Sequence, residues 1–122
     1  MILLDANYAL RWFLGDVPEQ SEQVDQLLAS SEHESLRLEL ITLAEITYVL
    51  RGLGYDHEQI YTYLSQLYVY PSVIDPDDVV QAALTLFRET ILDFEDCTLL
   101  AYHKLQGWDV ATFDKALTKL IH

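Results

Sequence analysis

The sequence predicts one α/β domain with a three-layer α/β/α architecture, in which helices cover both faces of a central parallel sheet of about four or five strands. Two observations lead to this prediction. Short apolar runs alternate with longer segments whose apolar residues recur every three or four positions, which is the pattern of parallel strands joined by helices. The chain has 122 residues, 51 % of them apolar, which is enough for one hydrophobic core and no second one.

Four apolar runs are predicted to be strands. The run at residues 2–4 ends at Asp5 and has the wholly apolar composition of a strand buried on both faces. The other runs lie at residues 36–40, 68–73 and 108–113. Pro71 has no amide donor for a sheet ladder, so the strand at 68–73 is expected at the edge of the sheet.

The helices are predicted from apolar stripes, caps and terminal glycines. They occupy residues 6–14, a segment that begins at Pro18, and residues 42–53, 56–67, 76–90, 94–105 and 115–121. Gly15 and Gly107 stand where two of these helices should end. Thr42 and Glu45 match the Ser/Thr-x-x-Glu capping box, which predicts that the third helix begins at Thr42.

Carboxylates stand where predicted strands give way to helices. Asp5 follows the first apolar run and Asp114 follows the last, at the strand ends where ligands bind in parallel α/β folds. Glu45 and Asp96 lie near the starts of two other predicted helices. Each acid alone has a local explanation as a helix cap or as a first-turn charge that complements the helix dipole. For Glu45 alone, the capping box is the stronger explanation.

Together, the four acids have a chemical meaning that none has alone. Helix N-termini that converge at one sheet edge favour an anion, whereas carboxylates placed there create a cage of hard oxygen ligands suited to Mg²⁺ or Mn²⁺. Phosphodiester hydrolysis uses such a cage, because a metal ion stabilises charge on the attacking and leaving oxygens. The pattern therefore predicts a metal-dependent phosphodiester-cutting enzyme and leaves open whether one ion binds or two.

Four short segments resemble a known family. The segments are Met1–Asn7 (MILLDAN), Leu43–Arg51 (LAEITYVLR), Asp93–Asp96 (DFED) and Ala111–Lys115 (ATFDK). In this order, and over essentially the whole chain, they resemble the PIN domain, the small ribonuclease fold of VapC-type toxins in bacterial toxin–antitoxin pairs. The resemblance implies metal-dependent endoribonuclease activity on RNA, with Mg²⁺ or Mn²⁺ as cofactor, and a parallel sheet whose first strand is central.

The resemblance also implies roles for individual residues. The family's metal-holding quartet of acids corresponds to Asp5, Glu45, Asp96 and Asp114. Asp93 is similar to an auxiliary acid one turn before the third member, and Asn7 and Thr112 match positions that support the site through hydrogen bonds. Arg11, one helical turn beyond Asn7, either holds a phosphate of the substrate or faces solvent.

The net charge bears on the partners. Twenty acids against seven bases give a net charge of −13, so the chain lacks the basic footprint of a typical nucleic-acid binder, although lysines outnumber acids from Lys104 onward. A toxin of this kind is expected to bind a VapB-like antitoxin whose tail lays an apolar helix, and an arginine, into the acidic cleft. Several tyrosines between Tyr48 and Tyr70 are candidates for that groove, for a homodimer face or for the core.

The cysteine and the histidines narrow the chemistry. Cys97 is the single cysteine, which excludes an intrachain disulfide and indicates a reducing compartment. It replaces the small apolar residue usual in the family and is expected to be buried rather than catalytic. No histidines have the His-x-x-x-His spacing of a zinc site. With no signal-peptide pattern and no apolar run of about 20 residues, the protein is expected to be cytoplasmic, with no membrane contact.

Two alternatives remain open from the sequence. A phosphoacceptor receiver is also a doubly wound domain of similar length with an acidic Mg²⁺ pocket, but it carries paired acids after its first strand, whereas Asp5 is followed by Ala6. A degenerate PIN domain that only binds partners is the second alternative, and it would not need the complete quartet.

Overall fold

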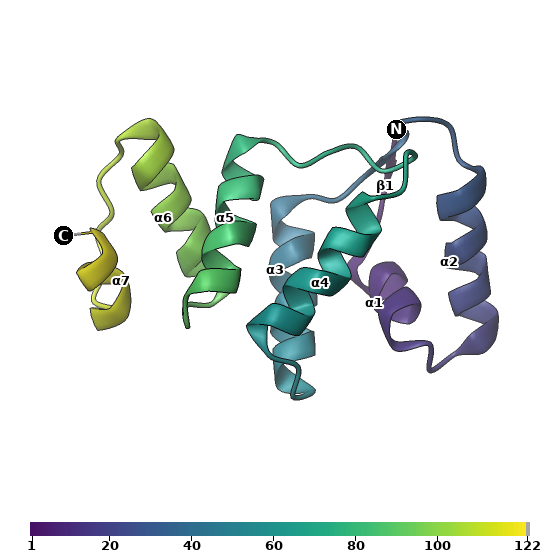
Figure 1. The fold of residues 1–122 in the computed structure, drawn as a ribbon, viewed down its shortest axis with the longest axis horizontal. Helices are drawn as coiled ribbons and strands as arrows, with labels where there is room; N and C mark the ends of the chain where they lie inside the picture. Colours follow the sequence, from purple (N-terminus) through teal and green to yellow (C-terminus); the bar gives the residue numbers. More distant parts are fainter. Residues whose placement is uncertain (122) are drawn as a thin grey trace. The chain divides into compact units, whose positions relative to one another are not determined.

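The computed structural model describes residues 1–121 (Figure 1). In chain order its elements are β1 (Ile2–Leu3), α1 (Ala6–Leu14), α2 (Pro18–Ser30), β2 (Leu36–Arg37), α3 (Leu40–Gly52), α4 (His57–Tyr68), α5 (Asp78–Glu89), α6 (Phe94–Gln106) and α7 (Lys115–Ile121). The chain divides into two compact units, one ending at Asp75 and one beginning at Pro76. The first unit holds both strands and the first four helices, and the second unit is helical.

The sheet of the first unit is parallel, as predicted. Ile2 pairs with Leu36 and Leu3 with Arg37. On the other side of β2, Val73 forms an isolated parallel bridge to Leu36, so it lies at the sheet edge. Within the described chain it is therefore β2, and not the first strand, that has neighbours on both sides.

The predicted strand at 68–73 is wrong except for Val73. Helix α4 continues to Tyr68, and a turn follows in which the Val73 N–H donates to the Tyr70 carbonyl over 3.0 Å. Pro71 sits in this turn, where its missing donor costs nothing. Only Val73 then pairs with β2. The segment that the sequence predicted to be a strand therefore forms the end of a helix and a turn.

The remaining strand predictions also need correction. The run at 108–113 pairs with no strand in the described chain, and its end residues Trp108 and Phe113 are exposed. β2 is shorter than the predicted 36–40. In β1, Ile2 and Leu3 are 47 % and 64 % exposed, so the strand is not buried on both faces. Over residues 1–121 the sheet has two strands and one bridge, fewer than the four or five expected.

Helix boundaries follow the local signals closely. Helix α1 spans the predicted residues and ends at Gly15, whose φ of 61° is the left-handed conformation that glycine adopts without strain. In α4, Asp56 and Gln59 form a complete capping box. Helix α5 begins at Asp78 rather than Pro76, because the Asp77 side chain caps it by accepting from the Val80 N–H. These ends are set by side chains close in sequence.

The start of α3 differs from the prediction in a way that matters for Glu45. The Leu43 N–H donates to the Glu39 carbonyl over 3.0 Å, which closes the first turn earlier than Thr42 would allow. Helix α3 therefore begins at Leu40, with Glu39 at the N-cap position and no side-chain cap. Thr42 lies inside the helix, so the predicted capping box does not form.

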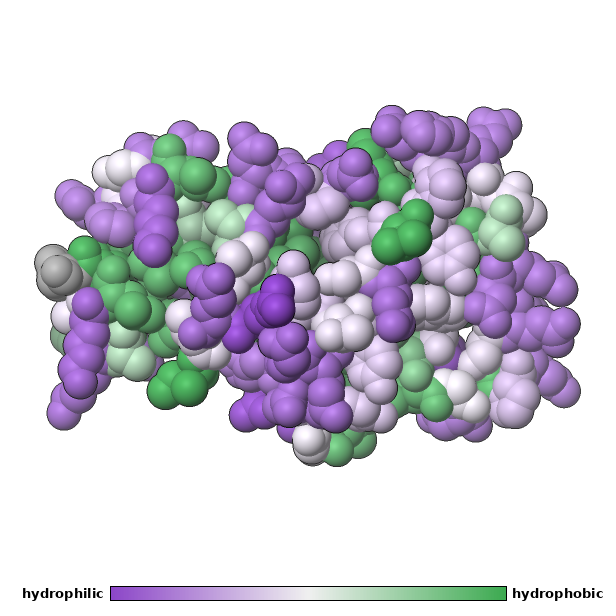
Figure 2. All heavy atoms as spheres, viewed as in Figure 1, coloured by the Kyte–Doolittle hydropathy of each residue, from purple (hydrophilic) through white to green (hydrophobic). Residues whose placement is uncertain are grey.

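Buried apolar side chains occur in both units. In the first, α1 packs on α2 and α3, and α3 packs on α4. Its fully buried large side chains are Leu28, Leu36, Leu43, Ile46, Leu50, Ile60, Leu64 and Leu67. In the second, α6 packs on α5 and α7, with Phe87 and Phe94 in edge-to-face contact at 6.1 Å. Apolar side chains also reach the surface over α6 and α7 (Figure 2).

Candidate active site

Asp5 stands at the junction of β1 and α1. Its backbone is extended, and its Oδ1 accepts a hydrogen bond from the Ala6 N–H over 2.9 Å, so the side chain caps the helix as predicted. The residue is exposed, and Oδ2 has no hydrogen-bond partner among residues 1–121. Capping thus occupies one carboxylate oxygen and leaves the other available to a ligand.

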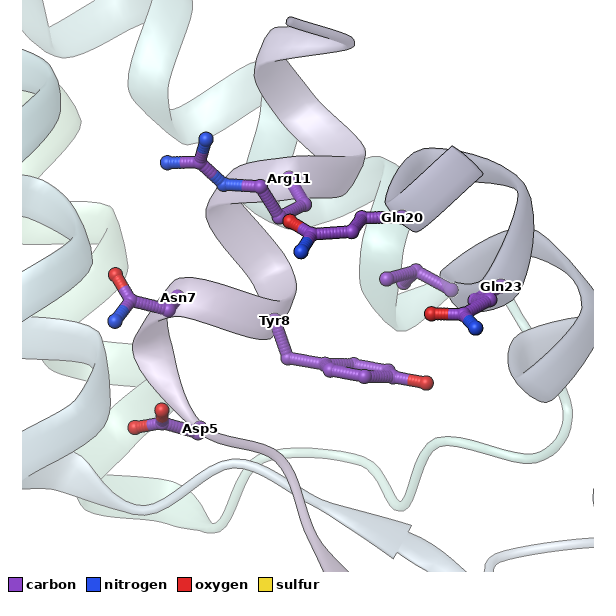
Figure 3. A pocket seen from close by; sticks show the side chains of 7 residues that line it. Asp5, Asn7, Tyr8, Arg11, Gln20 and Gln23 are labelled. Carbon is purple, nitrogen blue, oxygen red and sulfur yellow. The ribbon is translucent and has the colours of Figure 1, made fainter. Parts of the chain in front are cut away.

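An open pocket of about 420 Å³ lies beside Asp5, between α1 and α2 (Figure 3). It is lined by Asp5, Asn7, Tyr8, Arg11, Gln20, Gln23 and Val24. Figure 3 shows the side chains of Asp5, Asn7 and Arg11 on the same side of α1. The structure therefore places three of the sequence-predicted residues on one wall of one pocket.

Arg11 is neither a free solvent-facing side chain nor a buried one. Its Nη1 lies 2.9 Å from Oδ2 of Asp16, and the side chain is 28 % exposed. The aspartate fixes one side of the guanidinium, which carries more donors than one carboxylate uses. The sequence left open a phosphate contact and a solvent-facing side chain for Arg11, and both stay predictions.

Glu45 occupies the second turn of α3. Its side chain is exposed and makes no ion pair or hydrogen bond within residues 1–121. Because the capping box is absent, the local structural explanation for this acid is lost. Helices α1 and α3 pack together, so Asp5 and Glu45 stand near the starts of two adjoining helices.

Three of the acids in the second unit influence Asp96. Asp93 caps α6, accepting from the Asp96 N–H over 2.8 Å. Burial, followed by the negative charges of Asp93, Asp114 and Glu95, raises the pKa of Asp96 from 3.8 to about 6. Such a shift marks a place where ionised carboxylates lack compensating positive charge.

Asp114 is held by the backbone around it. Its Oδ1 accepts from the Leu117 N–H over 2.8 Å, and its own N–H donates to Oγ1 of Thr112 over 3.0 Å. Thr112 thus makes a hydrogen bond of the kind expected for a supporting residue.

Cys97, on α6, has no exposed surface, and burial raises the pKa of its thiol to about 11. The thiol is therefore protonated near neutral pH, in agreement with the prediction of a buried, non-catalytic residue.

The predicted site residues divide between the two units. Asp5, Asn7, Arg11 and Glu45 belong to the first, and Asp93, Asp96, Thr112 and Asp114 belong to the second. Within residues 1–121, no three His, Cys, Asp or Glu side chains form a group that could hold a metal ion. The meeting of all four quartet acids in one site stays a prediction.

Sequence reasoning missed Tyr8, Gln20 and Gln23, which line the pocket, and Glu95, which acts on Asp96. Gln20 and Gln23 share a helix face at i, i+3 spacing, but sequence alone does not tell which face of α2 turns toward α1. Tyr8 directly follows Asn7, but nothing in the sequence distinguishes it from the other seven tyrosines.

The family model of the PIN domain matches residues 2–121. The chain belongs to the PIN-domain family. This membership confirms the α/β class and the three-layer α/β/α type predicted from the sequence, and the match runs through both compact units. No curated protein and no solved structure matches the chain significantly.

PIN domains are generally nucleases, hydrolases that act on nucleic acid, and they typically bind divalent metal ions. The donors of this PIN domain fit such an ion, because carboxylate oxygens are the ligands that Mg²⁺ and Mn²⁺ prefer. The raised pKa of Asp96 also indicates an excess of negative charge beside this carboxylate. No helix within residues 1–121 is long and apolar enough to cross a membrane.

Proposed function

We propose that this PIN domain is a Mg²⁺- or Mn²⁺-dependent endoribonuclease and the toxin of a type II toxin–antitoxin pair that acts in the cytoplasm. The observation that carries the proposal is the family match over residues 2–121, combined with acids at all four motif positions. Those positions are Asp5, Glu45, Asp96 and Asp114. The proposal treats residues 1–122 as one catalytic domain.

Each acid has a defined task in the proposed reaction. Asp5, Asp96 and Asp114 would hold the cation through carboxylate oxygens, which for Asp5 and Asp114 are those that their capping bonds leave available. Glu45 would orient the cation or the attacking water. A bound divalent cation supplies Lewis-acid activation of water and stabilises charge on the oxygens of the scissile phosphate. Thr112 supports Asp114, because its hydroxyl Oγ1 accepts a hydrogen bond from the Asp114 N–H over 3.0 Å.

The remaining predicted residues contact the substrate or add negative charge beside Asp96. Arg11 contacts an RNA phosphate from the pocket wall, Asn7 supports the same wall, and Asp93 adds negative charge beside Asp96. Since the chain carries a net charge of −13, the cation and Arg11 offset the repulsion that RNA otherwise meets here.

A VapB-like antitoxin is part of the proposal, and the surface of α3 supports it. Ile41 and Tyr48 are each 81 % exposed and flank Glu45 at i, i+4 and i, i+7 spacing along one helix stripe. Such a stripe suits an amphipathic helix that carries one basic side chain. By contrast, Tyr55, Tyr63 and Tyr70 contact other aromatic rings of the first unit and belong to its packing.

The decisive experiment replaces Asp5 by Asn, which removes the charge and retains the ability to cap α1. Asp56→Asn is the matched control, because Asp56 caps α4 in the same unit and lies outside the family motifs. We expect Asp5→Asn to lower metal-dependent RNA cleavage at least roughly a hundredfold, while Asp56→Asn cleaves like the wild type.

Two results would count against the proposal. Full cleavage by Asp5→Asn removes this acid from the site. No cleavage of any RNA by the purified wild type, with either metal, favours a PIN domain that only binds partners. We also propose that the protein forms a homodimer. Size-exclusion chromatography with light scattering tests this, and a monomer at micromolar concentration contradicts it.

A further inference from the structure

The pocket between α1 and α2 has chemistry that the acid quartet does not use. Besides Asp5 and Arg11, its lining consists of one aromatic ring, that of Tyr8, and the amides of Asn7, Gln20 and Gln23, with Val24 as its apolar part. Its volume of about 420 Å³ falls within the range of small-ligand sites, roughly 300–1,000 Å³. Every lining residue belongs to the first compact unit.

The amides of the pocket are available to a ligand. Within residues 1–121, the side chains of Asn7, Gln20 and Gln23 make no hydrogen bond to other protein groups. Each amide offers donors and an acceptor side by side. Figure 3 shows Gln20 reaching from α2 toward α1 near Arg11, and the Tyr8 ring extending from α1 toward Gln23.

The two walls are tied together, so the pocket exists before any ligand arrives. The Ser21 hydroxyl donates to the Arg11 carbonyl over 2.6 Å, and the Trp12 indole N–H donates to Asp25 over 2.7 Å. Asp16 holds Arg11 from the loop that joins the helices. These bonds fix the two helices, so binding has to order the lining side chains but not the helices themselves.

This combination fits a ribonucleotide better than other ligands. Paired amides recognise the edge of a nucleobase through a donor and an acceptor, and an aromatic ring stacks on its face. A guanidinium recognises phosphate oxygens in the same plane. A bare metal ion gains little from amides, and a ligand without a base would leave the Tyr8 ring and the two glutamine amides unused.

We propose that this pocket binds one nucleotide of the RNA substrate, with Gln20 and Gln23 reading the edge of its base, Tyr8 stacking on the base and Arg11 holding its phosphate. The inference rests on the proposed ribonuclease function and deepens it. Asp5 belongs both to the pocket and to the proposed quartet, so the bound nucleotide adjoins the scissile phosphate. Gln20 and Gln23 therefore set the preferred base at that position of the cleavage sequence.

Nucleotide binding can be measured apart from cleavage, using the full chain in EDTA. We expect adenosine, guanosine, cytidine or uridine 5′-monophosphate to shift the side-chain amide NMR signals of Gln20 and Gln23. Ribose 5-phosphate, which has no base, should leave them in place. The double variant Gln20→Ala/Gln23→Ala should bind the preferred monophosphate about five- to a hundredfold more weakly.

Gln26→Ala is the matched control, because Gln26 lies on the same helix outside the pocket lining. It should bind the monophosphate like the wild type. The inference is overturned if none of the four monophosphates shifts the two glutamines, if ribose 5-phosphate shifts them equally, or if the double variant binds undiminished.

Cleavage of a randomised RNA pool separates this inference from the function on which it rests. The double variant should cut with an altered base preference at one position, while Gln26→Ala keeps the wild-type preference. Cleavage by the double variant with unchanged preference overturns the subsite and leaves the ribonuclease standing. Binding of a monophosphate by a wild type that cleaves no RNA overturns the ribonuclease and leaves the nucleotide site standing.

Discussion

Replacing Asp96 by Asn should stabilise the protein at neutral pH and have no effect in acid. Asp96 ionises close to the negative charges of Asp93, Glu95 and Asp114, and among residues 76–121 no ion pair with Asp96 compensates for them. Asn keeps the size of the side chain, can donate to Asp93 as the protonated acid does, and carries no charge. The substitution therefore removes an electrostatic cost while preserving the packing.

The size of the effect follows from the pKa. Burial first, and neighbouring charges second, raise the pKa of Asp96 from 3.8 to about 6. At about 1.4 kcal/mol for each tenfold change in proton affinity, this corresponds to about 3 kcal/mol. The carboxylate is partly exposed, and solvent screening reduces the expected gain to about 1–2 kcal/mol.

The direction with pH follows from linkage. Between about pH 4 and pH 6 the folded state holds a proton on Asp96 that the unfolded state has released, so the wild type loses stability as the pH rises through this window. The variant has no proton to lose at this position. The difference in unfolding free energy should be near zero below about pH 4 and complete above about pH 7.

Urea unfolding of both proteins in EDTA, at several pH values, measures this difference. Asp109→Asn is the control, since it removes one exposed carboxylate of the same unit and should change stability by less than about 0.5 kcal/mol. A difference between Asp96→Asn and wild type that is constant with pH would refute the reasoning, as would a variant less stable than wild type at pH 8.

Three further predictions follow from the same structure. Mg²⁺ or Mn²⁺ should raise the melting temperature of the wild type, because a bound cation neutralises crowded carboxylates, and Asp96→Asn should respond less in differential scanning fluorimetry; an equal response argues against Asp96 as a ligand. Asp56→Ala should cost about 1 kcal/mol in chemical denaturation by removing the α4 cap at 2.8 Å, with RNA cleavage kept, and a variant as stable as wild type contradicts the cap's role. Arg11→Gln should weaken RNA binding in EDTA to a similar extent across RNA sequences and lower the salt dependence by about one counterion, whereas an unchanged salt slope removes Arg11 from the phosphate contact.

What the sequence predicted well was decided by neighbours along the chain. Gly15 ended α1, Gly107 ended α6 and Asp5 capped α1, because each acts within four residues of itself. Strands depend on a partner far away in sequence, which an apolar run does not specify. For this reason two strand predictions were wrong: Tyr68 lies in α4, and residues 108–113 pair with no strand in the described chain.

In the candidate site, too, the residues found from the sequence belong to local motifs, and those that were missed depend on the packing of helices. The acids were found because each sits in a short motif, and two of them are local caps as predicted, Asp5 on α1 and Asp114 ahead of α7. Gln20 and Gln23 were not found, because the relevance of a surface amide depends on which helix faces it. The capping box predicted at Thr42 was wrong for a different reason. The local motif is present in the sequence, but α3 begins earlier, at Leu40, so Thr42 lies inside the helix.

The early start of α3 has a practical consequence for dissecting the chemistry. Asp5, Asp93 and Asp114 each hold a backbone amide of a helix, so any change there combines a chemical effect with a conformational one. Glu45 holds no such amide. Glu45→Gln is therefore a direct test of the proposed reaction. Any loss of cleavage rate would measure the part of this carboxylate in it, because the substitution removes no helix cap.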